Sequence, residues 1–218
     1  MKWLLLTALS VLVFTPVVGA IPITIYNTGV NNSNVVLATG TIDPHYLLTT
    51  SADPTGPGPN AYVDNTTAFP IPPWIGTSST SAWITPTTNA AANLNAGNYV
   101  FTTTFMLPVG FTSASLSGQW ATDNSGTMQL NGNSVGTPSA SFSSFTAFSI
   151  TTSFLAGTNT LSFTVNNAGT SPSPIGLRVE ISGAYTPAGQ VPEPSSLATI
   201  TGGLIALGAF ARRFRARP

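Results

Sequence analysis

The sequence contains no cysteine, only one histidine and very few charged residues. Without cysteine, the chain has no disulfide, no thiolate metal site and no cysteine nucleophile. With one histidine and few carboxylates, a catalytic triad or a histidine-based metal site has little to draw on. We therefore expect no cofactor and no metal site, and stability that comes from burial and from hydrogen bonds between strands.

Basic residues are almost absent from residues 21–190, where Arg178 is the only one. Five acidic residues accompany it, and one basic with five acidic side chains gives a formal charge of −4: Asp43, Asp53, Asp64, Asp123 and Glu180. A region without a basic patch cannot neutralise phosphate groups, which excludes nucleic-acid binding and electrostatic attraction to a membrane surface.

The carboxylates also argue against an enzyme. Glycoside hydrolysis usually needs two carboxylates about 5 to 10 Å apart, and no pair is recognisable in this sequence. Asp43 and Asp53 each precede a proline, and Asp123 precedes an asparagine, so local turn structure accounts for them. We expect no catalytic residue and no serine nucleophile.

Residues 1–20 read as a secretory signal peptide. Lys2 supplies the positive charge, residues 3–18 the apolar helix, and Val18-Gly19-Ala20 a small-residue cleavage site. We expect export through the Sec translocon, cleavage by signal peptidase and a mature chain that begins near Ile21.

Residues 191–218 combine three features. The stretch begins Val191-Pro192-Glu193-Pro194, which the prolines keep extended and exposed. An apolar run over 197–211 predicts a short hydrophobic helix, nearer fifteen residues than the ~20 that span a bilayer comfortably. Four arginines follow, and they are expected to stay cytoplasmic: Arg212, Arg213, Arg215 and Arg217.

This order of features resembles the PEP-CTERM sorting signal of exported bacterial proteins. The resemblance implies that Pro192, Glu193 and Pro194 are recognised and cut by an exosortase-type membrane protease, in cells that make extracellular polysaccharide. The chain would lie transiently in the inner membrane with its C-terminus in the cytoplasm, and then at the cell surface or outside the cell. A plain C-terminal anchor with a proline-rich stalk is the alternative.

Residues 21–190 predict one all-β domain, an antiparallel β-sandwich or jelly roll that is best defined over 98–186. Along 98–107, Tyr99, Phe101 and Phe105 fall on one face and threonines on the other, an alternation of period two. Asn131-Gly132 predicts a two-residue hairpin turn, because both residues tolerate positive φ. No stretch shows a convincing helical stripe.

Four segments resemble galactose-binding-like jelly-roll modules, many of which bind carbohydrate. They are residues 118–124, 128–132, 154–161 and 165–167. The resemblance implies a possible polysaccharide ligand for the domain, and it bears on the fold more than on function because most of it is turn and core.

Five residues are candidate sugar contacts: Trp74, His45, Asp123, Asn124 and Arg178. Trp74 follows two prolines on a predicted loop and would offer a flat ring to a pyranose, or else pack. Trp83 and Trp120 are expected in the core.

The polar candidates have structural alternatives. His45 would be a turn residue, and Asp123 with Asn124 an Asx turn or a structural calcium site. Arg178 would pair with an aspartate, with Glu180 out of its reach. We thus expect a non-catalytic exported surface or matrix protein that binds carbohydrate, with a structural or adhesive domain without a small ligand as the alternative.

Overall fold

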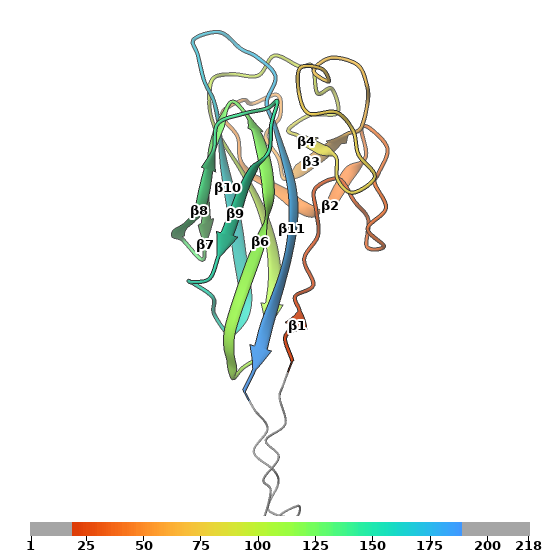
Figure 1. The fold of residues 1–218 in the computed structure, drawn as a ribbon. Helices are drawn as coiled ribbons and strands as arrows, with labels where there is room; N and C mark the ends of the chain where they lie inside the picture. The colour runs from red at the N-terminus through yellow and green to blue at the C-terminus, as the bar shows by residue number, and fades with distance from the viewer. Residues whose placement is uncertain (1–18, 189–218) are drawn as a thin grey trace, which may run out of the picture. The chain divides into compact units, whose positions relative to one another are not determined.

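The computed structural model describes residues 19–188, and within them the chain is all β (Figure 1). Gly19–Pro187 form one compact unit. No helix in this part of the chain could cross a membrane. Its strands are β1 (Ile21–Pro22), β2 (Ile42–Thr50), β3 (Asn60–Asp64), β4 (Trp83–Thr85), β5 (Gly97–Leu107), β6 (Phe111–Asp123), β7 (Ser125–Leu130), β8 (Asn133–Ser139), β9 (Thr146–Ile150), β10 (Gly157–Asn167) and β11 (Gly176–Pro187).

The strands pair antiparallel in the order β8-β7-β10-β5-β2-β3-β4-β11-β6-β9, and β1 pairs with Ala184 and Tyr185 near the end of β11. Because β8 and β9 contact each other although they end this order, the sheet folds back on itself into two layers (Figure 1). The predicted antiparallel all-β body is confirmed. The predicted signal helix and C-terminal hydrophobic helix lie outside the described residues.

Alternation of apolar and polar residues builds the core between the layers. On β10, Leu161, Phe163 and Val165 are fully buried, while the residues between them are hydroxyl-bearing and partly exposed. Trp120 of β6 packs against Phe163 across the core, with ring centroids 5.6 Å apart. The predictions that Trp83 and Trp120 are core residues are confirmed, since neither is exposed.

The hairpin between β7 and β8 also follows the sequence. Asn131 and Gly132 have φ values of 52° and 82°, and Leu130 pairs with Asn133. Positive φ at both central residues is the geometry of a primed turn, which suits the twist of the two strands. The Asn131 side chain further bonds to the Ser153 carbonyl and to Asn159, which ties the hairpin to the start of β10.

Gly118 of β6 tests how closely the strands approach. A Cβ added there would overlap the carbonyl oxygen of Glu180 on β11, so Gly118→Ala should lower the free energy of unfolding by about 2 kcal/mol. Gly76 is the matched control, since its Cβ position faces open space, and Gly76→Ala should stay within about 1 kcal/mol of the parent. Equal denaturation midpoints for the two variants would contradict the predicted clash.

Candidate functional site

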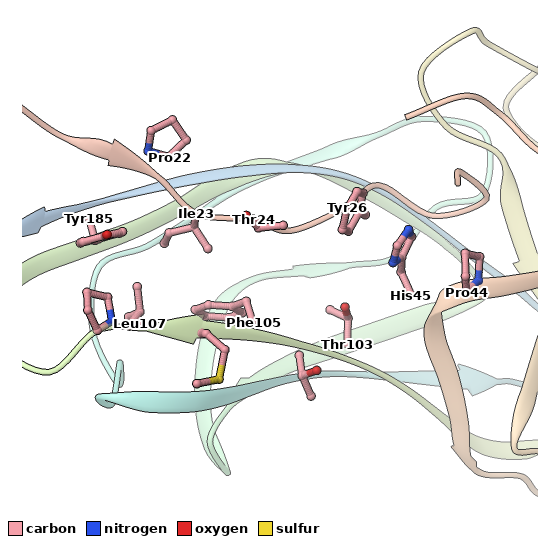
Figure 2. A pocket seen from close by; sticks show the side chains of 13 residues that line it. Pro22, Ile23, Thr24, Tyr26, Pro44, His45, Thr103, Phe105, Leu107 and Tyr185 are labelled. Atoms are coloured by element: carbon pink, nitrogen blue, oxygen red, sulfur yellow. The ribbon is translucent and has the colours of Figure 1, made fainter. Parts of the chain in front are cut away.

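A groove of ≈ 640 Å³ runs along one side of the domain. Three parts of the chain line it: the extended segment after β1, the start of β2 and the second half of β5, with one residue of β11 (Figure 2). Tyr26 and His45 lie toward one end of the groove, and Tyr185 lies at the other (Figure 2). The lining residues carry apolar and hydroxyl side chains but no formal positive or negative charge when His45 is neutral.

Tyr26 and His45 form an aromatic pair in the wall of this groove. Their rings stack with centroids 3.7 Å apart and planes 5° from parallel. The Tyr46 hydroxyl, buried in the core, donates a hydrogen bond of 2.9 Å to the Tyr26 carbonyl. This bond holds the Tyr26 backbone against β2, so the pair is a preformed flat surface.

The Asp43 carboxylate fixes the backbone at His45. Its carboxylate accepts backbone hydrogen bonds from Gly29 at 2.6 Å, His45 at 2.7 Å and Tyr46 at 3.0 Å. Burial raises the pKa of Asp43, and this outweighs the lowering by these bonds and by His45. The carboxylate accepts hydrogen bonds from three backbone N–H groups, so it stabilises the backbone conformation at the start of β2. It does not line the groove, where it could act as an acid or base.

Burial lowers the pKa of His45, although Asp43 and the Asn31 backbone act in the opposite direction. The imidazole is therefore neutral at neutral pH. Its Nε2 atom is buried and has no hydrogen-bond partner among the described residues. The ring consequently contributes a flat surface to the groove, and its buried nitrogen is not placed to take a proton from a ligand.

Trp74 does not offer its ring to solvent, contrary to one of the two expectations for it. It is 3% exposed, its ring lies 4.5 Å from that of Trp83, and its Nε1 donates to Asp123 Oδ2 at 2.8 Å. Ile71 and Ala121 complete this second apolar cluster. The loop after β3 folds onto the sheet because burying two indoles outweighs keeping the loop solvated.

Asp123 and Asn124 stabilise the β6–β7 connection. Burial raises the pKa of Asp123, against the hydrogen bond from Trp74. Asn124 Oδ1 accepts a hydrogen bond of 2.7 Å from the Ala168 backbone, and its own backbone N–H donates to the Asn166 carbonyl. Within residues 19–188 no group of three or more His, Asp or Glu is arranged to hold a metal ion.

Arg178 is 1% exposed and bonds to the loop before β4. It donates to Ser81 Oγ at 2.8 Å, to Ser78 Oγ at 2.6 Å and to the Gly76 carbonyl. Its charge partner is Glu180 at 3.8 Å, not an aspartate. The expectation that Glu180 is out of reach was wrong, because residues two apart on a strand project from the same face.

Burial raises the pKa of Glu180, but hydrogen bonds from Gln119, Ser81 and Thr80, together with the Arg178 charge, leave it lowered overall. Burial likewise lowers the pKa of Arg178, and Glu180 offsets part of this effect. Both groups are therefore charged at neutral pH, and both bond from β11 to the loop before β4.

Of the five candidate residues, only His45 lies in the groove. Trp74 and Asp123 bond to each other, while Arg178 and Asn124 hold loops elsewhere. The sequence reasoning missed Tyr26 and Tyr185 as groove residues. Tyr26 is out of phase with the alternation of Ile23 and Ile25, so no local pattern marks it as a groove residue.

Residues 132–136 read Gly-Asn-Ser-Val-Gly, the letter pattern of a nucleophile elbow, which the expectation of no serine nucleophile overlooked. That elbow needs a sharp turn between a strand and a helix. Here Ser134 lies on β8, exposed and paired with Gln129 within a hairpin. The local backbone therefore does not present this serine as a nucleophile.

Comparison with known families confirms the sorting signal. Residues 190–216 match the family described as the PEP-CTERM protein-sorting motif. The motif indicates an exported protein that is sorted to the cell surface and processed by an exosortase. A comparison with curated proteins finds no matching sequence.

Some solved structures are distantly similar. The family 35 carbohydrate-binding module from Clostridium thermocellum is 15% identical with a TM-score of 0.34, covering 64% of this chain and 93% of the module. The family 35 module from Cellvibrio japonicus is 16% identical with a TM-score of 0.28, covering 62% and 94%. An exo-β-1,3-galactanase from Phanerochaete chrysosporium is 16% identical with a TM-score of 0.29, covering 49% and 23%.

The chain spans 17 to 23% of the length of three carbohydrate-active enzymes that it matches. At these TM-scores the likeness defines neither a shared fold nor a ligand. The resemblance of residues 98–185 to galactose-binding-like modules stays a prediction.

Arg178 provides a stability test. Arg178→Met removes hydrogen bonds to Ser78, Ser81 and the Gly76 carbonyl, so the free energy of unfolding should fall by about 3 kcal/mol or more. Arg178→Lys keeps the charge but not the planar guanidinium, so its free energy of unfolding should lie between those of Arg178→Met and the parent. Chemical denaturation measures both. An unchanged midpoint for Arg178→Met would contradict a structural role.

The single histidine gives a test by pH. Because the pKa of His45 is lowered on folding, its contribution to stability is fully present above the unfolded value of about 6.5 and is lost progressively as the pH falls from that value through the lower pKa of the folded state. The melting temperature should therefore decline more steeply in the parent than in His45→Gln between about pH 7 and 5. Parallel profiles for the two proteins would show that His45 is not shielded in the folded state.

Proposed function

We propose that residues 19–188 form a non-catalytic domain that binds an uncharged polysaccharide in the groove of Tyr26 and His45, at the surface of the cell that exports it. The observation that supports this most directly is the stacked aromatic pair in the groove wall. A flat aromatic surface suits the apolar face of a sugar ring, and hydroxyl-bearing side chains at its rim suit the sugar hydroxyls.

The groove offers both kinds of contact. Tyr185 and the Tyr26–His45 pair supply the aromatic surface (Figure 2). Thr24 and Thr104 supply hydroxyl groups. A volume of ≈ 640 Å³ is enough for a ligand of a few sugar units.

Charge supports an uncharged ligand. The one basic side chain of residues 21–190 is Arg178, which is buried and already bonded away from the groove. A uronate or sulfate would therefore meet no cation there, and the formal charge of −4 would repel it. A neutral polysaccharide meets neither penalty.

A non-catalytic role is supported by the partners of the carboxylates. Each one already accepts hydrogen bonds from its own surroundings: Asp43 from three backbone N–H groups, Asp53 from Thr55 and Asn95, Asp64 from Thr66, Asp123 from Trp74, and Glu180 from Thr80, Ser81 and Gln119. None of the five lines the groove. General acid and base pairing is therefore not built into the groove.

We propose a specific order of steps for the export and processing of this chain. The chain would enter the Sec translocon by its signal peptide and stop in the inner membrane at residues 197–211, with the arginine cluster in the cytoplasm. The exosortase would then cut at Pro192-Glu193-Pro194. The proposed ligand is the polysaccharide outside the same cell.

A structural or adhesive domain without a small ligand is the second candidate, and one observation favours it. All three tryptophans of the domain are buried, so the strongest sugar-stacking side chains are used for packing. The outer face of β10 instead presents Thr160, Ser162 and Thr164, beside Thr102 and Thr104 of β5. Such an uncharged face would mate with another protein or with the matrix.

Replacing Tyr26 separates the two functions. Tyr26→Ala removes one ring of the aromatic pair, which at about 1 kcal/mol per aromatic contact should weaken binding of a neutral polysaccharide roughly fivefold. Isothermal titration with neutral and uronate-containing polysaccharides measures this. Trp74→Ala is a poor probe by comparison, because it disrupts the packed cluster with Trp83.

The matched control is Phe69→Ala, which removes an aromatic ring that is 60% exposed and outside the groove. It should bind as the parent does. Binding to no polysaccharide, together with self-association that rises with concentration, would overturn the groove proposal in favour of the adhesive domain.

A further inference from the structure

The two ends of the domain differ in charge. The β11–β6 ladder begins where Gly176 pairs with Asp123, and Arg178 and Glu180 follow within four residues. At the opposite end the ladder closes where Pro187 pairs with Phe111. The segments that meet at this second end are 19–24, 105–113, 151–158 and 183–188, and they contain no Asp, Glu, Lys, Arg or His. We refer to them as the uncharged end.

Large apolar side chains are exposed at this end. Val109, at the tip of the β5–β6 turn, is 92% exposed, and Met106 before it is 65% exposed. Leu155, in the loop that leads into β10, and Ile21 of β1 are also exposed. The pairing of Gly157 with Leu107 and of Ile21 with Tyr185 places all four at the same end of the sheet (Figure 1).

The chain also leaves the domain at this end. β11 ends at Pro187, next to the start of β6, and β1 pairs alongside its last residues (Figure 1). From Ala188 about eight residues lead to the apolar run over 197–211, a reach of at most ~30 Å even if fully extended. An apolar run anchored in a bilayer would thus keep the uncharged end, rather than the charged one, near the lipid.

We propose that the uncharged end rests on the lipid bilayer while the chain is still anchored by its tail, with Val109 and Leu155 reaching into the headgroup region. This inference rests on the membrane step of the proposed sorting pathway. Moving apolar side chains out of water lowers the free energy. Because this end has no charged group, no charge has to be desolvated. The partner is a lipid surface of no net charge, since the domain itself is acidic and has no basic patch.

The contact would orient the domain without anchoring it. A few partly inserted side chains give only weak and reversible attachment, and stable anchoring needs a second signal. Here the uncut tail is that second signal. The contact would hold the groove in a fixed orientation to the bilayer before cleavage, and it would release readily once the tail has been cut.

The absence of cysteine makes a direct test possible, because one introduced cysteine takes a single label. The chain from Ile21 to Pro218, exported with its own signal peptide and purified uncut, is labelled with an environment-sensitive dye at Val109→Cys or at Phe69→Cys, and it is inserted into phosphatidylcholine vesicles. We expect blue-shifted emission and at least threefold stronger quenching by spin-labelled phosphatidylcholine for the label at 109. Equal quenching at both positions overturns the proposal.

A second pair of variants guards against a label that merely perturbs the tip. Leu155→Asp should reduce quenching of the dye at 109 by about half or more, since the headgroup boundary disfavours a carboxylate. Val35→Asp, which changes an exposed apolar residue outside the uncharged end, should leave it unchanged. Equal effects of the two aspartates would overturn the proposal.

Vesicle flotation separates this inference from the function on which it rests. A chain that does not float with the vesicles overturns the membrane step and this proposal together. A chain that floats but shows no preferential quenching at 109 overturns the proposal alone. A blue shift at 109 that appears without vesicles and grows with protein concentration assigns this end to a second copy of the chain, which also overturns it.

Discussion

The buried guanidinium of Arg178 is the interaction on which the arrangement of this domain depends. It fixes Gly76, Ser78 and Ser81 against β11, and so it closes the long loop between β3 and β4 over the sheet. Closure buries Trp74 against Trp83 and places its indole N–H on Asp123. The buried charge is tolerated because each of the three guanidinium nitrogens donates a hydrogen bond and Glu180 lies 3.8 Å away. The same closure removes Trp74 from the surface, so the ligand site that we propose is the groove lined by Tyr26 and His45.

Scarcity of charge explains much of the rest. With so few ionisable groups, the domain uses carboxylates as acceptors for backbone N–H groups, as at Asp43, and Asn side chains as ties between hairpins, as at Asn131 and Asn159. These bonds satisfy buried polar groups. They also hold segments of the chain together, as disulfides or ion pairs would otherwise do. The part of the chain that the structure describes carries few charged groups and no free cation, and its formal charge is −4, so the ligands proposed for it are a neutral glycan and a neutral lipid surface.

Local sequence patterns predicted those strands and turns whose conformation depends on neighbouring residues. The period of two along 98–107 and the Asn131-Gly132 turn gave strands and a hairpin where the structure has them, because each depends on residues adjacent in sequence. The groove could not be predicted in this way. Tyr26 stacks on His45 where the pairing of β2 with β3 shifts register between Ile42 and Leu47, and where the Tyr46 hydroxyl donates to the Tyr26 carbonyl. Burial of the loop between β3 and β4 could not be predicted from the sequence either, since the partners of Trp74 and Arg178 come from segments far apart in the sequence.

The groove and the uncharged end share residues, and this determines which substitutions are informative. Tyr185 and Met106 line the groove and also lie where the chain leaves the domain. A change at either would alter glycan and lipid contacts together. Val109 and Leu155 do not line the groove, while Tyr26 and His45 lie toward its far end from Tyr185 (Figure 2). Loss of lipid contact at Val109 with glycan binding intact would therefore mean that the two surfaces act independently, although they adjoin on one domain.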